Sequence, residues 1–148
     1  MKKCGILIIF LIIIFGAYTF FSQRQQMQDA DQTFIYNLSE ANSCFGVDYT
    51  KLSEEDKISY YMKAASSLNV AIYTLKYTSY DDKQDLGNAL GSLNLSISLH
   101  SASQSTNRSR AFNEKEHDIF MCLSHITFNT NDKNNCKELI KVTNEIGY

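Results

Sequence analysis

The sequence contains no proline and no tryptophan, and only 6 of its 148 residues are glycine. Without proline, nothing in the chain forces a helix to break. Apolar residues recur at alternating steps of three and four along most of the chain, while the strict alternation typical of half-buried strands is essentially missing. These features predict an all-α fold and exclude architectures built on a sheet.

Motifs for catalysis and for phosphate binding are missing as well. No serine stands in a G-x-S-x-G turn, and no glycine-rich segment follows a strand pattern, as phosphate-binding loops require. His100, His117 and His125 all fall in expected helices, and no nucleophile is framed beside them by a strained turn. We therefore expect a protein that is not an enzyme, with no catalytic residues and no cofactor.

The chain also lacks a basic surface. Lysine and arginine total 14 against 16 acidic residues, so the formal net charge is −2. Setting aside Lys2 and Lys3 leaves 12 basic residues against 16 acidic ones, which gives the rest of the chain a formal charge of −4. In that part, Arg108 and Arg110 form the only tight basic pair. Nucleic-acid binders carry a clustered basic face, so this class of partner is excluded.

What the sequence does contain is one long apolar run. The segment 5-21 carries no charge, and as a helix it would measure about 26 Å, slightly less than the roughly 30 Å hydrocarbon thickness of a bilayer. Lys2 and Lys3 precede the run, and an aromatic cluster of Tyr18, Phe20 and Phe21 closes it. Lysines and aromatic rings are the side chains that anchor a span at its two interfaces. The pattern predicts a transmembrane signal-anchor helix over 5-21, with lipid as its surroundings.

A cleaved signal peptide is the alternative interpretation of the same segment, because a basic start followed by Ile6–Phe15 fits that class too. Ala17 and Thr19 are the only small residues at the required separation, and they match a cleavage site poorly. The cations before the run outnumber Arg24 after it, which favours a cytoplasmic N-terminus at 1-4 and a C-terminal domain outside. We expect a single-pass protein of the cell membrane, or a secreted or periplasmic protein if the segment is cleaved.

The rest of the chain predicts a helix over 22-46 followed by a bundle over 47-148. Gly46 provides the stop for the juxtamembrane helix 22-46, and Ser53 is a cap that opens a second helix with an acidic first turn. Asp132 caps the last helix, and a polar linker over 101–110 separates two helical hairpins. The expected core stripes are Ile58, Tyr61, Ala65, Leu68, Ile72 and Leu75, then Leu86, Leu90, Leu93 and Ile97, then Ile119, Phe120, Leu123 and Ile126, and finally Leu139, Ile140, Thr143 and Ile146. This is the pattern of a small antiparallel bundle in the extracytoplasmic space.

Three cysteines follow the apolar run, namely Cys44, Cys122 and Cys136. In an oxidising compartment two of them can pair. Cys122 and Cys136 stand at similar heights in the expected C-terminal hairpin, so we predict a disulfide between them. A Cys44–Cys136 bond and three reduced, buried thiols remain the alternatives.

The charged segment 114–118 adjoins Cys122 and His125, which suggests metal chemistry. A metal site formed by His117, Cys122, His125 and Cys136 has suitable ligand types, but it lacks the paired spacings of structural zinc. We interpret 114–118 as a solvated, acidic first helical turn instead. A secreted or anchored metal-binding protein that uses these histidines and cysteines is the alternative function.

Five tyrosines gather on and around the second expected helix, namely Tyr60, Tyr61, Tyr73, Tyr77 and Tyr80. Tyrosine is favoured at protein interfaces because it combines a large apolar area with a polar tip. We predict that Tyr73, Tyr77 and Tyr80 bind an unknown protein partner. The expected function is that of a non-catalytic, membrane-anchored envelope adaptor or immunity-type inhibitor, or of a subunit in a larger membrane complex.

Overall fold

The structure, a computed structural model, describes residues 2–102 and 114–146, and the side chains of residues 11–99 and 114–146. The described residues form five α-helices and one short 3-10 helix, and none of them is in a strand, so the expected all-helical bundle is confirmed for this part of the chain. The elements are α1 (Lys2–Phe45), η1 (Tyr49–Lys51), α2 (Glu54–Leu75), α3 (Lys83–Ala102), α5 (Glu116–Phe128) and α6 (Lys133–Ile146). The linker expected over 101–110 lies, from residue 103 onward, outside the described residues.

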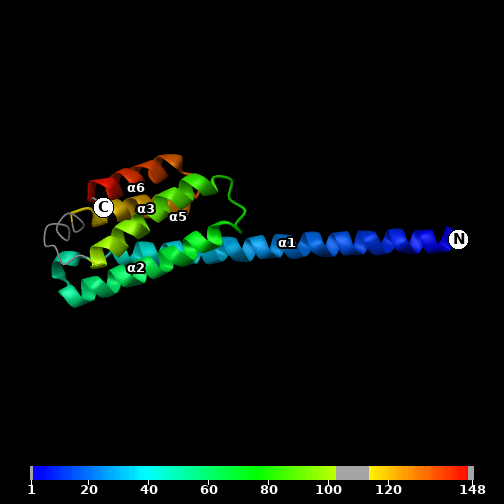
Figure 1. The fold of residues 1–148 in the computed structure, drawn as a ribbon, viewed down its shortest axis with the longest axis horizontal. Helices are drawn as coiled ribbons and strands as arrows, with labels where there is room; N and C mark the ends of the chain where they lie inside the picture. Colours follow the sequence, from blue (N-terminus) through cyan, green and yellow to red (C-terminus); the bar gives the residue numbers. More distant parts are fainter. Residues whose placement is uncertain (1, 103–113, 147–148) are drawn as a thin grey trace.

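Each helix of the bundle packs mainly against two others. The order around the bundle is α1, α2, α3, α6 and α5, after which α5 returns to α1. The helices therefore form a closed ring of two hairpins, α2 with α3 and α5 with α6, and the second half of α1 completes it (Figure 1). The first half of α1 leaves the ring as a long rod that ends at the N-terminus.

The helix α1 contributes directly to the core, because Ala30, Phe34, Leu38 and Ala41 are all buried. The expected juxtamembrane helix is thus the fifth wall of the bundle. It ends at Phe45, immediately before Gly46, as the sequence predicts. A side chain added at Gly46 would place its Cβ only 3.0 Å from the Phe120 ring, so this glycine also permits α5 to approach the end of α1.

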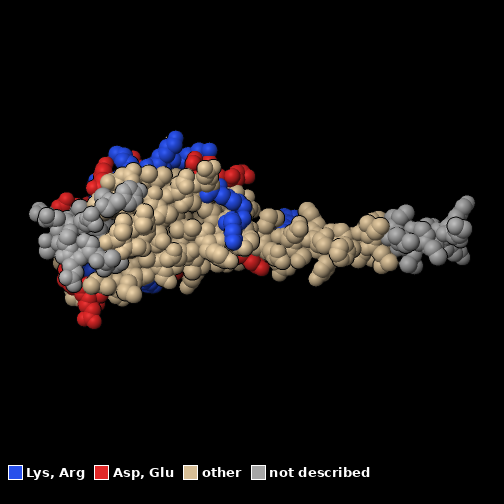
Figure 2. Space-filling model, in the orientation of Figure 1, with Lys and Arg blue, Asp and Glu red and all other residues tan. Residues whose placement is uncertain are grey.

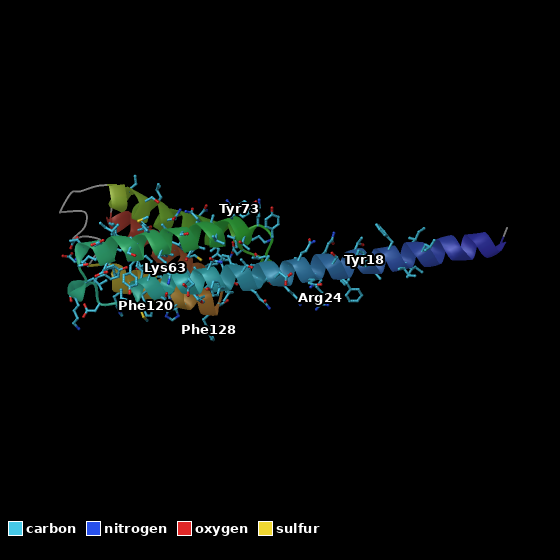
Figure 3. The ribbon with its side chains drawn as sticks, turned by 90° about the horizontal axis from the view of Figure 1, so that it is seen from below. Tyr18, Arg24, Lys63, Tyr73, Phe120 and Phe128 are labelled. Carbon is cyan, nitrogen blue, oxygen red and sulfur yellow. The ribbon has the colours of Figure 1, made fainter. Side chains whose placement is uncertain are left out.

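No helix in the described part of the chain has an apolar stretch long enough to cross a membrane. The first residues of the span expected over 5-21 belong to α1, but the structure does not describe the side chains of residues 2–10. From Leu11 to Phe21 the large apolar side chains are exposed along the rod. Figure 3 shows Tyr18 and Arg24 on this rod, clear of the bundle.

The helix starts read from the sequence are confirmed by their hydrogen bonds. The Ser53 hydroxyl accepts a hydrogen bond from the backbone N–H of Asp56 at 3.1 Å, which caps α2. The Asp132 carboxylate accepts hydrogen bonds from the backbone N–H groups of Asn134 and Asn135 at 3.1 and 3.0 Å. Both caps satisfy amides that the first turn of a helix leaves without partners.

Helix α2 buries a slightly different face from the one expected. The helical spacing predicts Ile58 in the core, yet Ile58 is 51% exposed, while Ala64 and Ala71 are fully buried. The reason is that α2 lies between α1 and α3, and small alanines at these positions let both neighbours approach closely. The stripes expected on α3, α5 and α6 are buried, except that Phe120 and Ile140 are only partly buried.

Candidate partner-binding site

Two of the three tyrosines predicted to bind a partner form an exposed cluster at the C-terminal end of α2. Tyr73 is 67% exposed and Tyr77 is 53% exposed, and their rings meet edge to face at a centroid distance of 6.2 Å. The Lys76 ammonium lies over both rings, 4.3 Å from the Tyr73 centroid and 4.6 Å from the Tyr77 centroid. These three residues are called the tyrosine–lysine cluster below. The ammonium thus contacts both rings and restricts their positions at the surface.

The Lys76 ammonium also changes the acidity of the cluster. Its hydrogen bond with Tyr77 lowers the pKa of that phenol and raises the pKa of the lysine. Both rings nevertheless keep more than half of their surface exposed. Such a surface suits a partner that offers apolar or aromatic contacts.

Tyr80 is separated from the other two tyrosines. Its ring packs against Phe34 of α1 at a centroid distance of 5.3 Å, and its hydroxyl donates a hydrogen bond to the Asp31 carbonyl at 3.4 Å. Burial raises the pKa of Tyr80 to about 12. The Asp31 carboxylate holds the same loop by accepting hydrogen bonds from the N–H and the hydroxyl of Ser79 at 2.8 and 2.7 Å. Tyr80 thus joins the α2–α3 loop to α1.

The outward face of α2 extends the tyrosine–lysine cluster with apolar side chains that the sequence did not assign to a surface. Ile58, Met62 and Val70 are exposed on the helix that carries Tyr73. No charged residue occurs between Ala64 and Leu75, nor in α3 after Asp85 apart from His100. Figure 2 shows the consequence: charged side chains gather along α6 and at the ends of the bundle, while the surface over α2 and α3 is largely uncharged.

Phe128, at the end of α5, is the most exposed large hydrophobic residue in the described part of the chain, at 94%. Figure 3 shows it on the side of α1 opposite Tyr73. Its exposure could not be predicted from the sequence, because a phenylalanine next to a core stripe also fits the interior. Its position makes it a natural control for substitutions in the tyrosine–lysine cluster.

At the opposite end of the bundle, a buried polar cluster joins the ends of α1, η1, α2 and α5. The Tyr61 hydroxyl donates a hydrogen bond to Glu116 Oε1 at 2.5 Å, and the Tyr61 ring stacks on Tyr49 at 5.1 Å. The Tyr49 hydroxyl in turn donates to the Cys44 carbonyl at 2.8 Å. Burial raises the pKa of both tyrosines well above the ordinary value, so they remain neutral donors.

Glu116 is the exception to the interpretation of 114–118 as a solvated turn, because Glu114, His117 and Asp118 are exposed whereas Glu116 is only 6% exposed. Burial raises the pKa of Glu116 to about 7, although the hydrogen bond from Tyr61 and the charge of Lys57 both act to lower it. A signal was present in the sequence, since Glu116 continues the stripe of Ile119 and Leu123 by a step of three. A hollow of about 380 Å³ beside it is lined by Asp48, Glu114, His117 and Phe120, among others.

The predicted disulfide is not formed in the structure, where Cys44, Cys122 and Cys136 are buried free thiols. Cys122 of α5 and Cys136 of α6 lie on helices that pack against each other, and each faces the core. Burial raises the pKa of both thiols to about 11, and a charge on Cys122 would raise the pKa of Cys136 further. The structure therefore brings the predicted pair to one interface and leaves Cys44 on α1.

The residues of the metal alternative do not converge on a site. His117 lies at the rim of the hollow beside Glu116, whereas His125 is exposed on α5. Among the residues the structure describes, no three histidine, cysteine or acidic side chains are placed to hold a metal ion together. This alternative therefore has no observation of its own in its favour.

Comparison of the chain with protein-family models, with curated proteins and with solved structures found no match. The function is accordingly argued from the residues and their arrangement.

Proposed function

We propose that this protein is a membrane-anchored, non-catalytic helical bundle that binds another protein through the outward face of α2. The observation that carries the proposal is the tyrosine–lysine cluster at the end of an uncharged helix face. Exposed tyrosines next to apolar residues are the usual centres of binding energy at protein interfaces. The envelope adaptor and the immunity-type inhibitor both fit this description.

The proposed anchor is the segment 5-21. Its support is the uncharged apolar sequence and the exposure of the described side chains from Leu11 to Phe21, which no other part of the described bundle covers. A continuous apolar surface of this kind requires lipid or another apolar partner to remove it from water. Lys2 and Lys3 favour an orientation with the bundle outside the cytoplasm.

The proposed partner contacts Tyr73 and Tyr77 first, with Met62 and Val70 extending the contact along α2. The rings need little ordering on binding, because Lys76 already restricts them. Less conformational entropy is then lost when the complex forms. The partner needs no strong charge, since the central part of this face carries none.

The proposal is tested by capture of partners from native membranes with the full-length tagged chain. The double variant Tyr73→Ala/Tyr77→Ala should lose a specific partner that the unsubstituted chain and Phe128→Ala both retain. Phe128 is the matched control because it is an exposed aromatic residue on the opposite side of α1. Recovery of no specific partner, or equal loss with Phe128→Ala, would contradict the proposed face.

A further inference from the structure

The helix α1 connects the apolar segment to the bundle without a break, because it runs continuously from Lys2 to Phe45. Its second half is a wall of the core through Ala30, Phe34 and Leu38. Asp31 and Phe34 also hold the α2–α3 loop, through Ser79 and Tyr80. The bundle is therefore fixed to the rod, and the position of the rod determines the position of the bundle.

The rise of α1 sets the height of the α2–α3 end of the bundle. A helix rises about 1.5 Å per residue, so Gln26 lies about 8 Å and Ala30 about 14 Å beyond Phe21, the last residue of the apolar run. The polar headgroup layer on one side of a bilayer is roughly 5–8 Å thick. A hollow of about 460 Å³ between α1 and the end of α2 spans the outer edge of this layer, because it is lined by Gln23, Gln26, Met27, Ala30 and Tyr77.

The side chains at this level have the chemistry of a membrane interface. Tyr77 combines an exposed ring with a polar tip, and Lys76 carries its charge on a long apolar stem. Met27 is exposed on α1 beside them, and Arg24 follows the apolar run by less than one turn. Tyrosine, lysine and arginine are the residues that membrane proteins place among lipid headgroups.

We infer that the α2–α3 end of the bundle rests on the lipid headgroup layer, with Tyr77, Lys76 and Met27 in contact with lipid. This inference rests on the proposed anchor at 5-21. Tyr73 lies one helical turn further from the membrane, so it stands above the lipid. Tyr77 stands at the boundary, where it meets the headgroups on one side and, together with Tyr73, the protein partner on the other. The bundle then stands on the bilayer at a fixed height and in a fixed orientation.

The absence of tryptophan makes the inference directly testable, because each Trp variant carries a single fluorescent reporter. The full-length chain is reconstituted in phosphatidylcholine vesicles in which some lipids carry a nitroxide quencher, either on the headgroup or on the acyl chain. Phe15→Trp reports insertion of the apolar segment. Tyr77→Trp reports the bundle end, and Tyr36→Trp, at a position about 22 Å beyond Phe21, reports the side of the bundle.

The expected result is about a twofold loss of Tyr77→Trp fluorescence with the headgroup quencher, and little loss for Tyr36→Trp. Phe15→Trp should respond to the acyl-chain quencher. Met27→Trp provides a second reporter in the same hollow, should Tyr77→Trp fail to fold by circular dichroism.

The other outcomes separate the two proposals. If Phe15→Trp is not quenched, the anchor itself is wrong, and the inference falls with it. If Phe15→Trp is quenched but Tyr77→Trp and Met27→Trp are not, the anchor stands and contact with the headgroups is overturned. Equal quenching of Tyr36→Trp and Tyr77→Trp would mean that the bundle lies on its side, which also overturns the inference.

Discussion

At the scale of single residues, Glu116 stands out because an ionisable carboxyl group is buried in the bundle. A carboxyl group is rarely placed in a core unless a donor satisfies it, and here Tyr61 supplies that donor. The network continues through Tyr49 to the backbone at the end of α1. One ionisable group thus connects three parts of the chain that are distant in sequence.

Glu116 makes stability depend on pH in a definite direction. Its pKa is about 7 in the folded chain, above the ordinary value of 4.5, so the stability contributed by its neutral form is complete below about pH 4.5 and is lost as pH rises through 7. The free energy of unfolding should fall by about 2 kcal/mol between pH 5 and 8 from this source. The Glu116→Gln variant, measured by urea unfolding, should lack this decline.

The acidic groups with lowered pKa do not obscure that measurement. Asp48, Asp82, Asp132 and Glu145 contribute stability that is lost only as pH falls through their folded pKa values, which lie below this window. Their contributions stay constant from pH 5 to 8. An identical decline in Glu116→Gln and in the unsubstituted chain would show that Glu116 is not the source.

The cysteine pair remains a prediction at the same scale. Material from an oxidising compartment should gain about 2 Da in intact mass on reduction, as two thiols replace one Cys122–Cys136 bond. The gain should persist in Cys44→Ser and disappear in Cys122→Ser. A mass unchanged by reduction would leave all three as the free thiols seen in the structure.

At the scale of helices, sequence signals predict where helices begin and end, but not which face of a helix its neighbouring helices bury. Ser53, Asp132 and Gly46 act within one turn of themselves, so the sequence alone predicted the ends of their helices. Which face α2 buries depends instead on its having two neighbours. Helical spacing therefore predicts the helix correctly but places Ile58 on the wrong face.

The cap of α2 offers a test of a local contribution. Replacing Ser53 by Ala removes the acceptor for the Asp56 amide and should lower the free energy of unfolding by about 1 kcal/mol. Ser59→Ala, at an exposed position inside the same helix, is the matched control and should change little. Equal effects of the two substitutions would argue against a capping role for Ser53.

The seam of α3 offers a test of a packing contribution. Leu90 is fully buried, so Leu90→Ala should cost about 2–5 kcal/mol in urea unfolding through lost contacts and the cavity it leaves. Leu95→Ala, on the half-exposed side of the same helix, should cost far less. A small effect at Leu90 would mean that α3 is not packed as described.

At the scale of the whole molecule, the candidate site could be predicted only in part. Tyr73 and Tyr77 share a face because they are four residues apart, and sequence spacing is enough to show that. Tyr80 lies elsewhere because it packs on Phe34 of α1, and Glu116 is buried because Tyr61 meets it from 55 residues away. Contacts of that range depend on the closed ring of helices, which no local pattern contains.

Because α1 is both the apolar rod and a wall of the bundle, the position of a protease cut decides which part of the chain is released. A protease that cuts between residues 22 and 29 would separate the rod and release a bundle whose five walls are all present. A cut beyond Ala30 would instead remove part of a wall and open the core to water, because Phe34 and Leu38 belong to it. If residues 5–21 anchor the chain in a membrane, the bundle can be released in a folded, diffusible form only by a cut within residues 22–29.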